Sequence, residues 1–144
     1  MADPSMVSGE SGMAATEWAE SGPEPRDETE EWVRLAARAA ATKTDEETVV
    51  LEVGRVLSIV GWFVVTAGRN PRQVRTIAEE IEQQVATAGG PKPRRTEGLD
   101  ALEWVLLDYG DFVVHVFHTE TRKFYELERL WRDVPRLDWR TGTD

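Results

Sequence analysis

Two apolar segments, residues 103–108 and 112–117, constrain the fold more than any other feature of the sequence. Only three residues separate them, and the central one is Gly110. A three-residue connection with glycine between two apolar runs is typical of a β-hairpin. Both segments are apolar on both strand faces. We therefore expect helices on both sides of the sheet, or an exposed apolar patch on one of them.

Helix-start signals and hydrophobic periodicity predict the other elements. Asp27 with Glu30 forms a capping box, and Asn70 before Pro71 is an N-cap followed by proline at the first helical position. We predict helices at 27–43, at 70–88 and from Thr119 or Thr121 to 134, strands at 48–53, 62–67, 103–108 and 112–117, and a loop at 90–100. This order, α-β-β-α-β-β-α, indicates an α/β fold with a mixed sheet flanked by helices. The first two strands are apolar at nearly every residue, so we expect them to be central.

The last helix carries an apolar stripe of its own. Phe124, Leu127, Leu130 and Trp131 recur at helical spacing, and Pro135 ends the segment. We assign Leu127, Leu130 and Trp131 to the core.

The charge of the chain is unevenly distributed. Residues 1–31 carry nine acidic side chains and one basic side chain, whereas residues 32–144 carry 18 acidic and 16 basic ones. Residues 1–26 are also poor in large apolar side chains, so we interpret them as a disordered acidic N-terminal tail. The α/β domain then spans 27–134, and 135–144 form a C-terminal tail. The total net charge of −10 argues against sequence-independent binding to DNA or RNA.

The sequence contains no cysteine, which excludes disulfides, thiolate catalysis and cysteine-ligated metal sites. It shows no signal-peptide pattern, and its longest apolar run, residues 56–67, is shorter than the ~20 residues that a membrane span needs. We therefore expect a cytoplasmic protein without membrane contact.

The polar residues do not form a recognisable catalytic pattern. His115 and His118 are three apart on a predicted strand, so they point to opposite faces and are not expected to share a metal ion. Asp108 and Asp111 lie across a turn and not at the Asp-x-Asp spacing that holds Mg²⁺ for phosphoryl chemistry. We predict no catalytic residues, no cofactor and no metal site.

The hairpin supports two interpretations of its side chains. Alternation places Trp104, Leu106 and Asp108 on one face and Val105, Leu107 and Tyr109 on the other. The aromatic residues are either core residues or anchors of a protein interface. Asp108 and Asp111 either stabilise the turn or pair with a basic partner.

Basic residues gather around the second predicted helix and the loop after it. They are Arg69, Arg72, Arg75, Lys92, Arg94 and Arg95. They form a solvated surface, a minor contact with RNA, or a contact with the acidic tail of the same chain. Reversing Arg94 and Arg95 to Glu distinguishes an RNA contact from a merely solvated surface, because only an RNA contact would make the substitution change the salt dependence of binding.

Long segments of the chain resemble the ribosomal silencing factor (Iojap-like) family. The resemblance rests on residues 104–117 and 122–131, and upstream on 57–60, 63–65, Gly68, Asn70 and 72–74. It covers about residues 30–134. The chain departs from the family at Gly61, where the family usually has an Asp before the aromatic residue of its second strand.

The resemblance implies a fold like that of nucleotidyltransferases without catalytic residues. It further implies binding to protein fourteen of the large ribosomal subunit, steric block of subunit joining, repression of translation, and a homodimer when free. The predicted interface residues are Trp104, Leu106, Asp108, Tyr109 and Asp111. Trp104 and Leu106 are expected as apolar anchors, Tyr109 as an aromatic edge, and the two aspartates as partners of basic residues.

Two alternatives to the repressor remain at this stage. The first is a degenerate nucleotidyltransferase-like enzyme or nucleotide binder, which the missing Asp-x-Asp pair disfavours. The second is an assembly factor for the large subunit, which would use the same binding site at a different time.

Overall fold

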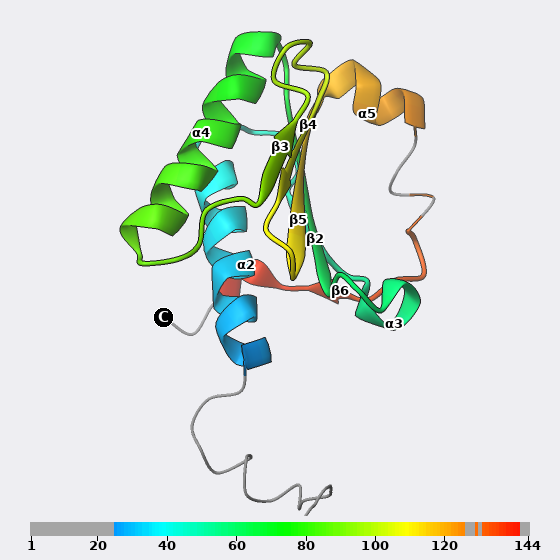
Figure 1. Ribbon diagram of the computed structural model, residues 1–144. Coiled ribbons are helices and arrows are strands. Elements are labelled where there is room, and N and C mark those ends of the chain that lie inside the picture. Colours follow the sequence, from blue (N-terminus) through cyan, green and yellow to red (C-terminus); the bar gives the residue numbers. More distant parts are fainter. Residues whose placement is uncertain (1–24, 126–128, 130, 142–144) are drawn as a thin grey trace, which may run out of the picture.

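The protein is built around a six-stranded β-sheet with helices on both faces (Figure 1). The structure is a computed structural model that describes residues 25–125, 129 and 131–141. Its elements are α2 (Pro25–Ala41), β1 (Val49–Glu52), α3 (Gly54–Leu57), β2 (Trp62–Gly68), α4 (Pro71–Thr87), β3 (Arg95–Glu97), β4 (Trp104–Asp108), β5 (Phe112–His118), α5 (Thr119–Tyr125), β6 (Arg136–Leu137) and the 3-10 helix η1 (Trp139–Thr141).

The sheet is mixed, with the strand order β3-β4-β5-β2-β1-β6. The two central strands, β2 and β5, run parallel, and Val64 lies opposite Val114 in their register. The other neighbouring pairs are antiparallel, including the hairpin of β4 and β5, in which Leu107 lies opposite Val114. The predicted hairpin and the predicted central position of β2 are thus confirmed. Strand β1 is buried as well, but it is second from the edge of the sheet and not central.

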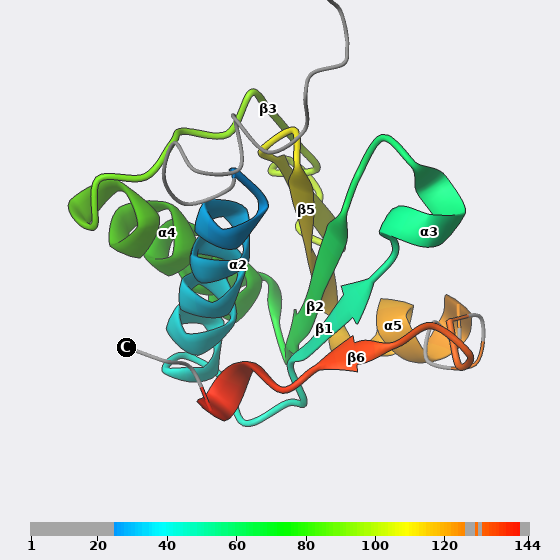
Figure 2. The ribbon, with the colours of Figure 1, turned by 90° about the horizontal axis from the view of Figure 1, so that it is seen from below.

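Helices α2 and α4 pack side by side on one face of the sheet (Figures 1 and 2). The apolar stripe of α4 is buried at Val74, Ile77, Ala78, Ile81 and Val85. The Oδ1 atom of Asn70 accepts a hydrogen bond from the backbone N–H of Gln73 at 2.8 Å, and Pro71 occupies the first helical position. The predicted N-cap is therefore confirmed.

The opposite face of the sheet is covered less completely. In Figure 1, α5 and α3 lie on this side of the sheet and at opposite ends of it. On this face, the partly buried Trp131 packs edge-on against Phe63, with 5.4 Å between ring centroids. Trp131 thus packs against the core as predicted, through its contact with Phe63. It lies in a turn and not in the predicted helix. The predicted core residues Leu127 and Leu130 lie outside the described residues.

The predicted α-β-β-α-β-β-α order is incomplete. All seven predicted elements are present in that sequence, but α3, β3, β6 and η1 are additional. The strand β3 interrupts the segment predicted as a loop, since its backbone pairs with β4 from Arg95 opposite Asp108 to Glu97 opposite Leu106. It was missed because Arg-Thr-Glu has no apolar alternation, and its pairing comes from the free edge of β4.

The segment after Pro135 is not a tail in its described part. Leu137 in the edge strand β6 pairs with Val50 of β1, and Trp139 is only 6% exposed. The indole Nε1–H of Trp139 donates to the carbonyl of Thr48 at 2.9 Å. Residues 136–141 therefore belong to the domain, because they cover the open edge of β1 and complete the core beside α2.

Helix α2 begins at Pro25, so Asp27 lies in its first turn and not at its N-cap. Of the predicted tail, only Pro25 and Arg26 fall within the described residues. Among the helices that the structure describes, none combines the length and the apolar character needed to cross a bilayer.

Candidate protein-interaction face

Successive side chains of the hairpin strand β4 point to opposite faces of the sheet. Val105 and Leu107 are fully buried under α2 and α4. On the other face, Trp104 is 38% exposed, and Leu106 and Asp108 are partly exposed. The predicted alternation is correct, and this second surface of β4, formed by Trp104, Leu106 and Asp108, is called the open face below.

Trp104 is held firmly although it is partly exposed. Its Nε1–H donates to Nδ1 of His115 on β5 at 3.1 Å, and its ring lies 4.7 Å from that of Phe117. The indole is thus fixed by a hydrogen bond and an aromatic contact, although the residue stays partly exposed. An aromatic side chain fixed in this way is a suitable anchor for a protein partner, because little rotamer entropy is lost on binding.

His115 supports the open face from below. It is 9% exposed, and its ring packs edge-on against Phe63 with 4.6 Å between centroids. Burial lowers the pKa of His115 to about 4, so the imidazole is neutral near pH 7. Since Nδ1 accepts from Trp104, the proton resides on Nε2, which is buried and has no hydrogen-bond partner among the described residues.

Asp108 is engaged within the hairpin itself. Its Oδ1 accepts from the backbone N–H of Gly110 at 2.8 Å, and its Oδ2 lies 3.7 Å from Nη2 of Arg95. The first contact is the turn-stabilising role that Asp often has, and Gly110 adopts the positive φ of 93° that favours glycine. Asp108 therefore has a structural role, whatever it contacts in a complex.

The structure does not bring Tyr109 to the open face. The ring of Tyr109 stacks on Phe112 at 4.6 Å in the core beneath the helices, and only 7% of the residue is exposed. Burial, with a smaller contribution from the charge of Glu82, raises the pKa of Tyr109. Tyr109 is therefore not exposed as an aromatic edge in this structure, because strand alternation directs it inward with Val105 and Leu107, and its role in partner binding stays a prediction.

Asp111 lies at the far end of the hairpin from Trp104. It is exposed, and its Oδ2 accepts from the hydroxyl of Thr29 in α2 at 3.5 Å. Of the five predicted interface residues, the structure thus groups Trp104, Leu106 and Asp108, buries Tyr109 and separates Asp111.

Two residues of this region were missed from the sequence, His115 and Phe63. The hairpin register could have indicated His115, since pairing places Trp104 opposite Phe117 and Leu106 opposite His115. The contribution of Phe63 depends on the parallel pairing of β2 with β5, which has no local sequence signature.

A cavity of about 530 Å³ lies where the carboxyl ends of β2 and β5 diverge to α4 and α5. Such a switch point is where open α/β sheets often bind ligands. Here its polar lining includes Glu103, Glu120 and His118. Two carboxylates disfavour a phosphate group, and Nδ1 of His118 already accepts the backbone N–H of Glu120 at 3.1 Å.

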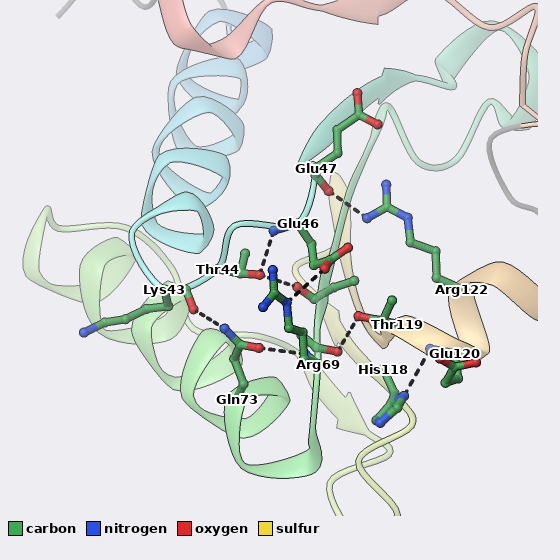
Figure 3. Close-up of polar contacts among 12 residues, drawn as sticks. Lys43, Thr44, Glu46, Glu47, Arg69, Gln73, His118, Thr119, Glu120 and Arg122 are labelled. Atoms are coloured by element: carbon green, nitrogen blue, oxygen red, sulfur yellow. Dashed lines mark hydrogen bonds and ion pairs between the residues drawn. The ribbon is translucent and has the colours of Figure 1, made fainter.

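Polar contacts tie together the loops at this end of the sheet (Figure 3). The hydroxyl of Thr119 donates to the Gly68 carbonyl at 2.9 Å, and Nη1 of Arg122 donates to the Glu47 carbonyl at 2.7 Å. Arg69 pairs with Glu46, with 3.3 Å between Nε and Oε2. These contacts fix the strand ends and leave the cavity without a dedicated anion-binding group among the described side chains.

Three of the six residues of the basic group contact neighbouring groups of the domain. Arg69 and Arg95 make ion pairs with Glu46 and Glu97. Arg75 Nη2 lies 3.4 Å from the Leu99 carbonyl. The other three cations, Arg72, Lys92 and Arg94, are exposed. Within residues 25–125, 129 and 131–141, the structure contains no group of three His, Asp or Glu side chains placed to hold a metal ion.

Comparison with known proteins assigns the family. Residues 26–143 match the family described as "Ribosomal silencing factor during starvation". Ribosomal silencing factor RsfS of Bacillus subtilis is 39% identical over 106 residues, which cover 74% of this chain and 89% of that protein. A crystal structure from Bacillus halodurans is 35% identical with a TM-score of 0.65, covering 76% of this chain and 98% of that one. A Mus musculus protein named "Mitochondrial assembly of ribosomal large subunit protein 1" is 29% identical over 85 residues, 57% of this chain and 37% of that protein. The chain belongs to the ribosomal silencing factor family.

Proposed function

We propose that this protein represses translation by binding protein fourteen of the large ribosomal subunit and blocking the approach of the small subunit. Membership of the ribosomal silencing factor family, which is regulatory and not enzymatic, supports the class of function. The observation that carries the binding site is the fixed and partly exposed Trp104 on the open face. The mechanism is steric and requires no covalent chemistry.

The open face has the composition of an interface centre. Trp104 offers a large aromatic surface that is already ordered, and Leu106 lies two residues along the same strand face. Buried aromatic anchors surrounded by apolar neighbours account for most of the binding energy in typical interfaces. We therefore assign the anchoring role to Trp104, with Leu106 beside it.

The two aspartates are proposed to orient a basic partner. Asp111 is exposed, whereas Asp108 is shared with Gly110 and Arg95. Asp111 is therefore the better candidate for a new ion pair, and Asp108 contributes mainly to the potential of the hairpin. Charges at an interface rim act mostly on the association rate and on orientation.

Co-sedimentation with purified large subunits, followed by a subunit-joining assay, tests the proposal. We expect the wild-type protein to pellet with large subunits and to reduce the formation of joined ribosomes. Trp104→Ala should abolish both effects, whereas Ile59→Ala, which changes an exposed apolar residue of another surface, should leave both unchanged. Leu106→Glu provides a second variant, since it places a charge on the open face without removing the indole from its contacts.

Each outcome of this experiment is decisive if folding is checked by circular dichroism. A wild-type protein that does not pellet with large subunits contradicts the binding proposal. Pelleting without reduced subunit joining contradicts steric block. Normal binding by folded Trp104→Ala and Leu106→Glu variants would remove the open face from the interface.

A role in assembly of the large subunit is the second candidate function. It is favoured by the similarity to the Mus musculus protein whose name refers to that assembly. Two results together would favour assembly over repression. Cells that lack the protein would accumulate large-subunit precursors, and subunits would join normally in vitro in the presence of the protein.

Three finer proposals follow from the family resemblance. We propose that the fold is nucleotidyltransferase-like without the catalytic carboxylates, and that the free protein is a cytoplasmic homodimer. Sedimentation equilibrium tests the dimer, and nucleotide titration tests the rival role of a nucleotide binder. The minor contact with ribosomal RNA predicts a weaker salt dependence of ribosome binding after reversal of Arg94 and Arg95 to Glu.

A further inference from the structure

An apolar surface lies at the end of the sheet opposite α5, around the single turn of α3. Val56 and Ile59 are 64% and 84% exposed there. Besides Trp104, they are the large hydrophobic residues that the described part of the chain leaves exposed. Beside them lies a cavity of about 310 Å³, lined by Thr29 of α2, residues 58–62 and Asp111. Val56, Ile59 and this cavity are called the α3 surface below.

The local backbone explains why these side chains face outward. The turn of α3 is closed by the N–H of Ser58, which donates to the Gly54 carbonyl at 2.9 Å, and Ser58 then adopts a positive φ of 58°. Leu57 and Val60 pack against the core on the less covered face of the sheet. One helical turn cannot bury four apolar residues on one side, so Val56 and Ile59 are directed away from the sheet.

We infer that the N-terminal segment, residues 1–24, docks on the α3 surface through Trp18. This segment joins the domain at the start of α2, and Figure 1 places the start of α2 and α3 at the same end of the molecule. Thr29, which lines the cavity, is four residues from Pro25, or roughly 6 Å along a helix. The seven residues from Trp18 to Pro25 span up to about 24 Å. Trp18 can therefore reach the cavity.

The composition of the N-terminal segment is suited to the α3 surface. Trp18 is its one aromatic residue, and its five acidic residues are accompanied by no basic one. At the same end of the domain, the side chain of Arg94 lies against Gly110, next to Asp111, and the described carboxylates make no ion pair with Arg94. Arg94 thus offers a counter-charge for the acidic residues that flank Trp18.

Covalent attachment favours this segment over a separate molecule. A short tether raises the effective concentration of Trp18 at the surface to roughly the millimolar range, so a small apolar contact suffices. The segment also lies outside residues 26–143, which match the family. The contact is therefore a property of this chain, and it does not depend on the proposed ribosome binding.

Paramagnetic relaxation in solution tests the inference. The chain has no cysteine, so Ala19→Cys attaches a nitroxide at one site only. In the full-length ¹⁵N-labelled protein, we expect the amide signals of residues 54–62 to lose most of their intensity and to recover when the nitroxide is reduced. Adding Trp18→Ala or Ile59→Ser should restore the signals, whereas Met13→Ala, an apolar change in the same segment, should not.

The competing outcomes are separated by mixing labelled chains. In the control sample, ¹⁵N-labelled protein that carries no nitroxide is mixed with nitroxide-labelled protein that carries no ¹⁵N. The amide signals of the ¹⁵N-labelled protein should show no broadening in this mixture. Broadening in that mixture would identify a second copy of the chain as the occupant and overturn the inference. Unbroadened signals at 54–62 in the singly labelled protein would also overturn it. Among the substituted residues the structure describes Ile59, which is exposed, and a preserved spectrum for β2 and β5 verifies folding in each case.

Discussion

Burial of His115 makes the stability of the protein depend on pH. Burial lowers the pKa of this imidazole to about 4 in the folded protein. In the unfolded chain the usual value is about 6.5. As the pH falls through 6.5 toward 4, the unfolded chain binds the proton first, so the free energy of unfolding decreases in this window. Above 6.5 the contribution of the neutral buried imidazole is fully present.

The size of the effect follows from the shift. A difference of about 2.5 units corresponds to about 3 kcal/mol in total, and about 2 kcal/mol of it is lost between pH 7 and pH 5. The structure supplies the reason. Protonation of Nδ1 would break the hydrogen bond from Trp104, and the rings of Phe63, Trp104 and Phe117 around His115 offer no compensating negative charge.

Urea unfolding followed by far-ultraviolet circular dichroism at pH 7 and pH 5 measures this contribution. We expect the wild-type protein to lose about 2 kcal/mol more than His115→Phe over this interval. His118→Gln is the matched control, since it removes a partly exposed histidine and leaves His115 and its contacts in place. Equal losses for wild type and His115→Phe would refute the reasoning, because His115 would then protonate in the folded state without penalty.

Three further substitutions test other parts of the fold by the same unfolding assay. Asn70→Ala removes the cap of α4 and should cost about 1 kcal/mol, whereas no loss would mean that water or a neighbour replaces it. Gly98→Ala should be strongly destabilising, because Gly98 has φ +90° and an added Cβ would meet the Trp104 carbonyl oxygen; a neutral effect would show that β3 and β4 separate easily there. Trp139→Phe should cost about 1–3 kcal/mol by leaving the Thr48 carbonyl without its buried donor, and an unchanged stability would contradict docking of the C-terminal segment.

Much of the fold was predictable because it depends on short-range patterns. The spacing of 103–108 and 112–117 around Gly110 specifies a hairpin, and Asn70 with Pro71 specifies a helix start. These patterns reflect backbone geometry and capping, which act within a few residues. The strands β3 and β6 escaped prediction because they have three and two residues, and they form by pairing with an edge that another segment provides.

The candidate site was only partly predictable for a related reason. Alternation correctly separated Trp104 and Leu106 from Tyr109, but it could not say which set faces a helix layer. The family resemblance then grouped Tyr109 with the interface, and the structure buries it against Phe112. His115 became relevant only when its ring was placed under Trp104 and beside Phe63.

The sequence by itself determined which residues share a strand face, where the helices begin, and the family to which the chain is similar. The tertiary structure decided which face is covered. Helices α2 and α4 come from segments far from the hairpin, and their packing buries Val105, Leu107 and Tyr109 while Trp104 stays partly exposed on the other side. The side-chain period of a strand is a local property of the backbone, whereas burial depends on the elements that fold onto it.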